Sequence, residues 1–211
     1  MRQVAHRAGL PQPRLVEAPV AVAEHLLATG VQLPVGAFIV VCDIGGGVEV
    51  TVLRRGLSGF EVLATLADSA AGGTAVDHGL VGALLGDVNV AGGDAVAGVM
   101  MESVRAAKEA LGAHPAVTVP LPDRPPVVAN SAMLADAARS VPQRAAQLTQ
   151  EAVAASELTI GDLAGLYCVG GSAYLPHLGK AIAEQIGITP VTPLEPGLAA
   201  ARGAAGAGAT E

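Results

Sequence analysis

The stretch IVVCDIGGGVEVTVL, residues 39–53, decides the fold that the rest of the chain has to accommodate. Residues 39–42 form a short apolar run rich in β-branched side chains, which is typical of a strand buried on both faces. Asp43 and the glycines Gly45, Gly46 and Gly47 follow, and residues 48–53 return as a second β-branched run. The sequence therefore predicts two strands joined by a glycine turn.

Consecutive glycines allow a tight turn whose backbone N–H groups can approach a phosphate closely. In dinucleotide-binding and P-loop motifs, however, the glycine loop opens a helix, whereas here it joins two strands. On the triplet alone, a plain hairpin with a glycine-rich turn is the simpler interpretation. A phosphate-binding interpretation depends on what the rest of the chain supplies.

Composition narrows the class of protein. The chain has 211 residues, 51% of them hydrophobic and only 2% aromatic, so its core is built from aliphatic side chains. The formal net charge of −7 argues against a broad nucleic-acid surface, which needs clustered Lys and Arg. We find no apolar run of the roughly 18–20 residues that a membrane span requires and no signal peptide, so neither a nucleic acid nor a membrane is an expected partner.

The two cysteines, Cys42 and Cys168, stand at the ends of predicted core strands. Neither lies in a CxxC motif or near a histidine at ligand spacing. Buried free thiols are the preferred interpretation over a disulfide or a metal site, and a cytoplasmic location is the resulting expectation. We also expect the two thiols on adjacent strands.

Several further segments resemble one protein family when taken in order. Asp43–Gly47 resembles the second phosphate motif, DLGGGTFD, of the actin, sugar-kinase and heat-shock chaperone superfamily. Val169–Pro176 resembles its adenosine motif, VGGSTRIP, and the segments 60–65 and 68–73 resemble FEVLAT and GDTHLGG. By order and spacing, the chain is identified as similar to the C-terminal half, or lobe II, of the nucleotide-binding domain of DnaK-type seventy-kilodalton heat-shock chaperones.

The resemblance implies an α/β fold: a ribonuclease-H-like, actin-like ATPase lobe with an inserted smaller α+β subdomain. The core subdomain would comprise residues 1–71 and 131–211, and the insertion residues 72–130. The family's first phosphate motif, DLGTTNS, has no counterpart here, which suggests that the sequence begins mid-domain. We expect two connecting helices, at residues 19–27 and 195–208, of which the second matches NPDEAVALGAA.

Periodicity and turn residues predict the remaining elements. Residues 1–10 are expected to end a helix at Gly9, and residues 86–94 to form a loop. A long helix over residues 131–155 is expected to have Ser131 as its N-cap and a kink at Pro142. The other expected helices span residues 74–85, 95–111 and 175–186, and the other expected strands span residues 60–66, 116–121, 126–129 and 166–169.

The resemblance also implies site residues. Asp43 matches the family's acidic residue near magnesium and the attacking water, so it is the candidate catalytic residue and an indirect, water-mediated metal contact. Lys108 matches the lysine of the motif ERAKRTLS, although a solvated helix charge explains it equally well. The candidate nucleotide-binding residues are Gly45, Gly46, Gly47, Gly72, Gly73, Lys108, Gly170, Gly171, Ser172 and Tyr174.

Other positions depart from the family's pattern. Val48 replaces a threonine near the γ-phosphate, and Glu49 matches the following aspartate only if one residue is deleted; otherwise Val50 takes that place. Ala18 replaces the glutamate of INEPT, with Glu17 beside it as a substitute. On the adenosine side, Thr74 replaces a ribose-binding glutamate, Arg105 and Gly112 replace the first and last residues of ERAKRTLS, and Tyr174 replaces an arginine that packs on adenine.

Three functional hypotheses follow. The first is half of a nucleotide-binding domain that binds ATP or ADP with magnesium in the intact protein, without efficient hydrolysis. The second is a degenerate lobe that acts as a protein-interaction module, with no nucleotide bound by this chain alone. The third is an exchange or assembly partner that docks onto a chaperone. The expected partners are the N-terminal lobe, a second copy of this chain, clients or co-chaperones.

Overall fold

The computed structural model describes residues 7–9, 15–86, 93–122 and 124–206. Its centre is a four-stranded sheet with the strand order β3-β2-β1-β6. β1 (Phe38–Ile44), β2 (Val48–Arg55) and β3 (Phe60–Asp68) are consecutive and antiparallel, whereas β6 (Leu163–Val169) joins β1 in parallel. The predicted strand pair around the glycine turn is therefore confirmed.

β1 is central because its side chains are apolar on both faces. Val40, Cys42 and Ile44 pack into one hydrophobic cluster, and Ile39 and Val41 pack into another on the opposite face. A strand that is apolar on both faces needs a covering layer on each side of the sheet. The outer edge of β6 is covered in turn by Val191, whose backbone exchanges hydrogen bonds with Leu166 and Cys168.

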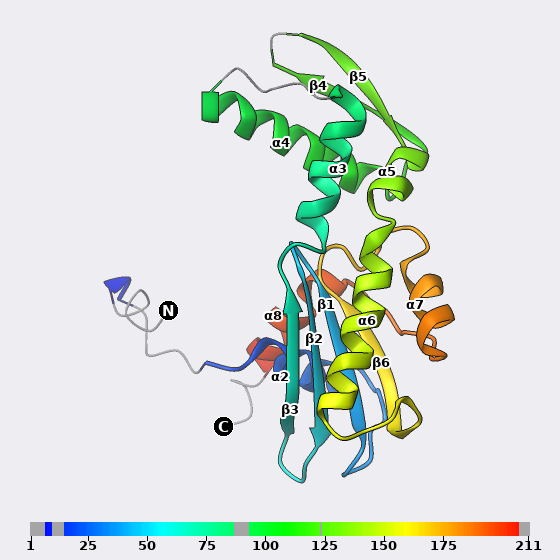
Figure 1. The fold of residues 1–211 in the computed structure, drawn as a ribbon. Coiled ribbons are helices and arrows are strands. Elements are labelled where there is room, and N and C mark those ends of the chain that lie inside the picture. The colour runs from blue at the N-terminus through cyan, green and yellow to red at the C-terminus, as the bar shows by residue number, and fades with distance from the viewer. Residues whose placement is uncertain (1–6, 10–14, 87–92, 123, 207–211) are drawn as a thin grey trace.

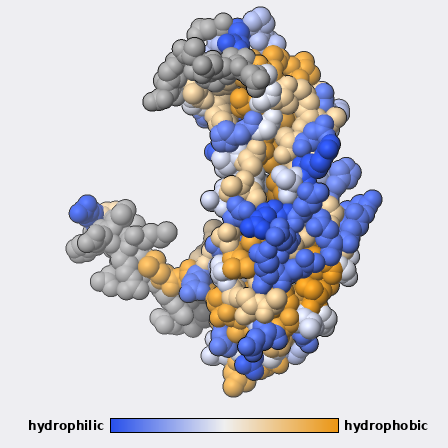
Figure 2. Space-filling view, in the orientation of Figure 1, coloured by the Kyte–Doolittle hydropathy of each residue, from blue (hydrophilic) through white to orange (hydrophobic). Residues whose placement is uncertain are grey.

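Helices cover both faces of this sheet (Figure 1). α6 (Ser140–Ala155) packs against β1, β2 and β3, with α7 (Leu178–Ile186) beside it, while α2 (Ala18–Ala28) and α8 (Ala199–Gly206) lie behind the sheet. The amphipathic α6 buries its apolar face and exposes Gln143, Gln147 and Gln150. Figure 2 shows hydrophilic residues gathered over this helix.

A second group of elements extends from the carboxyl end of β1. α3 (Gly73–Leu85), α4 (Gly93–Ala110) and α5 (Ser131–Ala137) surround a two-stranded antiparallel sheet of β4 (Ala116–Leu121) and β5 (Arg124–Asn130). This sheet shares no strand with the larger one, and its strand β4 packs against α4 (Figure 1). The α/β class is confirmed.

The helix predicted over residues 131–155 is wrong in two respects. Two helices, α5 and α6, replace it, and the chain changes direction at Ala138 and Arg139 rather than kinking at Pro142. Pro142 lies in the first turn of α6, where a missing N–H costs no helical hydrogen bond. The N-cap is Asn130, not Ser131, because the Asn130 side chain accepts a hydrogen bond from the Met133 N–H at 3.0 Å.

Other boundaries also differ from expectation. α7 begins at Leu178 rather than Leu175, after His177 in a left-handed conformation with φ 62°. The final segment has a single 3₁₀ turn, η2 (Pro196–Leu198), before α8; the turn η1 (Ile160–Asp162) precedes β6. Most of the helix expected to end at Gly9 and most of the loop expected at residues 86–94 lie outside the described residues.

The cysteine prediction is confirmed. Cys42 and Cys168 are directly paired positions on the parallel strands β1 and β6, and both are buried and free. Their mutual hydrogen bond, together with burial, raises the pKa of the Cys42 thiol well above its usual range. Because the thiolate is the reactive form, Cys42 is a core residue rather than a reactive thiol.

Candidate functional site

The Gly45–Gly47 turn stands where β1 and β2 meet. The Gly45 N–H donates to Gly47 O at 3.0 Å, which closes the turn. The N–H groups of Gly46 and Gly47 donate to no other residue that the structure describes. Two backbone N–H groups without a partner among the described residues can donate to an anionic oxygen on a glycine turn, where no side chain obstructs its approach.

Gly72 and Gly73 pack directly onto this turn. The Gly73 N–H donates to Gly45 O at 2.8 Å and the Thr74 N–H to Gly46 O at 3.0 Å, so the first turn of α3 is attached to the glycine turn. A Cβ at Gly72 would lie 2.6 Å from Gly46 O, so no other residue fits there without moving the backbone.

The segment after β6 also contacts the glycine turn. The Ser172 N–H donates to Ile44 O at 2.8 Å, and its hydroxyl donates to Gly45 O at 3.2 Å. Gly170 has φ 90°, and a Cβ there would lie 2.3 Å from Asp43 Oδ1. Three segments that are far apart in the sequence are thus held together at the ends of the parallel strands β1 and β6. We refer to Gly45–Gly47, Gly72–Gly73 and Gly170–Ser172 together as the glycine cradle.

Lys108, one of the candidate nucleotide-binding residues, reaches the cradle from α4. Its ammonium donates to Gly73 O at 3.1 Å and lies 2.7 Å from Oδ1 of Asp77, a buried acid in α3. That contact is an ion pair without the angular geometry of a hydrogen bond. Among the buried side-chain nitrogen and oxygen atoms of the described residues, Asp77 Oδ1 is therefore the one that lacks a hydrogen-bond partner. Sequence reasoning missed Asp77, although an isolated acid in the apolar segment 76–81 is a usable signal.

Asp43 lies at the end of β1 on the sheet face that α2 covers. Burial raises the pKa of its carboxyl above the usual range. The position directly opposite on β2 is Glu49, and both side chains line a narrow crevice with Thr51 and with Pro19 of α2. The structure therefore places Glu49, and not the fully buried Val50, beside Asp43.

Two other departures from the family's pattern, Val48 and Ala18, bring no polar side chain to the cradle. Val48 is buried in β2 and offers no polar group, while Ala18 opens α2 with Glu17 exposed beside it. Tyr174 is 62% exposed, so it is not held against the cradle, and a Cβ added at Gly171 would meet only open space. Among the described residues, no group of three or more His, Cys, Asp or Glu side chains is arranged to hold a metal.

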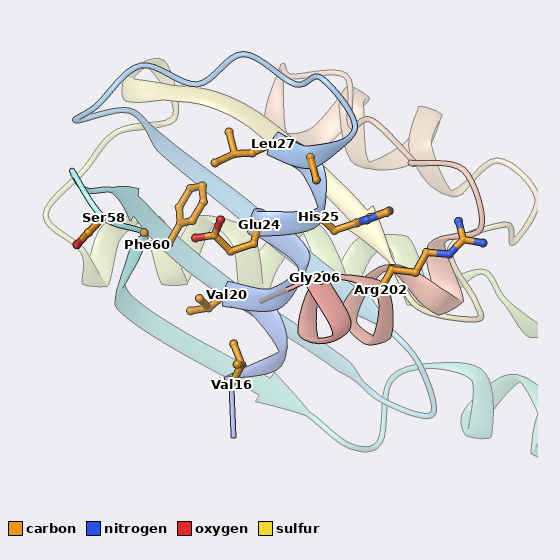
Figure 3. A pocket seen from close by; sticks show the side chains of 12 residues that line it. Val16, Val20, Glu24, His25, Leu27, Ser58, Phe60, Arg202 and Gly206 are labelled. Carbon is orange, nitrogen blue, oxygen red and sulfur yellow. The ribbon is translucent and has the colours of Figure 1, made fainter. Parts of the chain in front are cut away.

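A groove lies away from the cradle. This groove of about 660 Å³ follows α2 between the β2–β3 turn and α8. Figure 3 shows Val16, Val20 and Leu27 directed to the side of Phe60, with Arg202 beyond the other side of the helix. The groove contains none of the cradle residues, so size alone does not identify the site. No helix in the described part of the chain is long and apolar enough to cross a membrane.

Comparison with known proteins decides the family. The sequence model of the Hsp70 protein family matches residues 1–210. This chain belongs to the Hsp70 family. The expected resemblance to DnaK-type heat-shock chaperones is thereby confirmed.

Individual Hsp70 relatives give the same result. The chain is 34% identical over 97% of its length to a chaperone protein HscA homolog of Variovorax paradoxus, 33% to one of Chromobacterium violaceum, and 31% to one of Burkholderia ambifaria. It spans about a third of the length of these curated relatives, 33% of the first two and 34% of the third.

Proposed function

We propose that this chain is lobe II of an Hsp70 nucleotide-binding domain and that the glycine cradle binds ATP or ADP in the intact protein. The observation that carries this proposal is the meeting of the turn at Gly45–Gly47, the start of α3 and the segment after β6 around Lys108. Unpaired N–H groups and a buried ammonium at one place suit a phosphorylated ligand.

The proposed architecture divides the chain as the sequence suggested. Residues 1–71 and 131–211 would form the ribonuclease-H-like core around the four-stranded sheet, and residues 72–130 the inserted subdomain. The separate β4–β5 sheet supports this division, since it shares no strand with the larger sheet. The cradle would then lie at the junction, because α3 and α4 bring Gly73 and Lys108 to it.

The residue roles follow from chemistry. The Gly46 and Gly47 N–H groups and Lys108 would meet phosphate or ribose oxygens, while Asp43, with Glu49 opposite, would hold the water shell of a magnesium ion. Magnesium would neutralise phosphate charge. The buried Val48 and Val50 offer no polar group for positioning an attacking water, so we do not expect this chain alone to turn over ATP.

Calorimetric titration with magnesium ADP tests the binding proposal. We expect saturable binding, and Lys108→Met should weaken it about tenfold through loss of a charged hydrogen bond. Lys180→Met is the matched control because Lys180 is exposed in α7, away from the cradle. Absence of saturable binding, or equal losses in both variants, contradicts the proposal.

Phosphate release tests the hydrolysis expectation separately. Incubation of the chain with magnesium ATP should release phosphate at the background rate. A clear excess over background that Asp43→Ala abolishes would show that the chain hydrolyses ATP, and the expectation would be wrong.

The second candidate function is a protein-interaction module without nucleotide chemistry. The exposed Tyr174 and the buried Val48 favour it, since Tyr174 is not held at the cradle and Val48 offers no polar group there. The relatives are named chaperone protein HscA homolog, and for this chain we propose client or co-chaperone partners, or docking onto another chaperone, in the cytoplasm. Capture of a purified Hsp70 chaperone without ADP binding would favour this candidate.

A further inference from the structure

Asp77 is a buried acid beside the glycine cradle whose presence needs a physical reason. It lies in α3, one helical turn after Gly73, and is 1% exposed. An ionised carboxylate is costly to bury unless opposite charges or hydrogen bonds compensate it. Its Oδ1 has no hydrogen-bond partner in the described part of the chain, so α3 itself does not supply the compensation.

The compensation comes from two cations of α4. Lys108 Nζ lies 2.7 Å from Asp77 Oδ1, and Arg105 Nε lies 3.6 Å from Oδ2. The Lys108 side chain is only 12% exposed, whereas that of Arg105 is 60% exposed. Lys108 is therefore the buried partner, and Arg105 stands at the rim.

The Lys108 ammonium is also the cation that touches the cradle. It donates to Gly73 O at 3.1 Å, and a Cβ added to Gly73 would lie 3.2 Å from Nζ and 2.6 Å from Ser172 Oγ. An ammonium has three N–H groups. Among the described residues, Gly73 O accepts from one of these N–H groups and Asp77 attracts the ammonium as an ion pair, so an N–H remains for a ligand oxygen.

We propose that Asp77 is a positioning residue for nucleotide binding: it holds the Lys108 ammonium beside Gly73, where the remaining N–H meets an oxygen of ADP. A lysine side chain has a flexible four-carbon stem and many rotamers. The fixed carboxylate of Asp77 selects one of these rotamers before the ligand binds. This inference rests on the proposed nucleotide site. Asp77 touches no ligand itself, so its effect passes through Lys108.

The positioning can be measured without nucleotide. The chain has only two lysines, Lys108 and Lys180, so ¹⁵N-lysine labelling gives two ammonium signals. The held Lys108 ammonium should exchange its hydrogens slowly, while the 75% exposed Lys180 serves as the internal reference. Asp77→Asn should make Lys108 exchange as fast as Lys180, and Glu109→Gln, which removes an exposed charge next to Lys108, should change neither signal. Fast exchange of Lys108 in the unmutated chain overturns the proposal.

Nucleotide titration then tests the consequence. We expect Asp77→Asn and Lys108→Met each to weaken ADP binding about tenfold, and the double variant to bind no more weakly than Lys108→Met alone. A merely structural role of Asp77 would instead reduce affinity in both backgrounds. Losses that multiply, or an unaffected Asp77→Asn, overturn the proposal.

The experiments also distinguish two further outcomes: a variant that does not fold and a chain that does not bind ADP. If Asp77→Asn does not fold, Lys108→Arg carries the test: it keeps the charge beside Asp77 but moves the donors, so it should fold and bind ADP about tenfold more weakly. Unchanged affinity in Lys108→Arg overturns the proposal. If the unmutated chain binds no ADP, the proposed function fails, while the ammonium signals still decide whether Asp77 positions Lys108.

Discussion

Gly170 illustrates how a single residue in the cradle is fixed by its neighbours. Its φ of 90° lies in the left-handed region that L-residues with a Cβ rarely adopt. A Cβ would also lie 2.3 Å from Asp43 Oδ1 and 2.6 Å from Ile44 O. The adjacent Gly171 has neither constraint, since nothing lies within 4 Å of its added Cβ.

We therefore expect Gly170→Ala to lower the free energy of unfolding by at least about 2 kcal/mol, through backbone strain plus the collision with Asp43. Gly171→Ala, the matched control, should change it by less than about 0.5 kcal/mol. Urea unfolding followed by circular dichroism measures both. Similar stability of the two variants would contradict the steric account of Gly170.

Asp43 has a different property, because burial raises the pKa of its carboxyl. The ionised form is therefore disfavoured in the folded state, and at neutral pH the charge destabilises the fold. Asp43→Asn should then be more stable than the unmutated chain at pH 7. The gain should shrink as the pH falls through the raised pKa and vanish below the ordinary value of 3.8, where folded and unfolded chains are both protonated.

Urea unfolding at pH 7 and pH 3.5 measures this difference, provided that the chain is folded at both. Thr51→Val is a suitable control, since Thr51 lines the same crevice but does not titrate. A stability gain from Asp43→Asn that is independent of pH would show that charge is not its cause.

At the scale of elements, the backbones of α2 and α8 lie very close together where the two helices cross. Gly203 is buried, and a Cβ there would lie 1.7 Å from Ala21 O, so the glycine permits the contact between the two backbones. Only some of the small residues of the final segment are exposed. Ala199 and Gly203 instead pack inside the chain, against α2, whereas Ala201, Ala204 and Ala205 stay exposed.

Gly203→Ala should separate the two helices and lower the free energy of unfolding by about 1–3 kcal/mol, the usual cost of overpacking. Gly206→Ala at the end of α8 has open space around it and should be neutral or stabilising, because alanine favours helix. Thermal unfolding of the two variants gives the comparison. A Gly203→Ala chain as stable as Gly206→Ala would show that the crossing adjusts freely.

At the scale of the whole molecule, one side of the fold presents the α2 groove beside the exposed alanines of α8. Apolar surface of this kind usually marks an interface. We expect the isolated chain to self-associate through these helices, or to bind through them the N-terminal lobe that the proposed function implies. Sedimentation velocity over a concentration series should show a dimer that the double variant Ala201→Glu, Ala205→Glu disrupts.

Because Ala201 and Ala205 are exposed, their substitution leaves the contact between α2 and α8 intact, whereas truncation of the last segment would remove it. Ala154→Glu combined with Ala155→Glu, on the exposed end of α6, is the matched control and should sediment as the unmutated chain does. A strictly monomeric unmutated chain would contradict self-association.

The sequence predicted most elements of this fold for local reasons. The alternation of β-branched residues around Gly45–Gly47 defined the strand pair, and the apolar periodicity defined α3, α4 and α7 to within a few residues. It failed where a local choice depended on packing. Asn130 rather than Ser131 caps α5, and the break before α6 occurs at a pair of ordinary residues, Ala138 and Arg139.

By itself, the sequence determined the family, and through that resemblance the α/β class and the glycine segments of the candidate site, because the family's motifs occur in order along the chain. Only the tertiary structure decided which acid faces which partner. Glu49 lies opposite Asp43 because strand pairing sets that register, and Asp77 meets Lys108 because α3 and α4 pack together. Such pairings join residues distant in sequence, and their burial, which makes a charge costly without a partner, exists only in the folded chain.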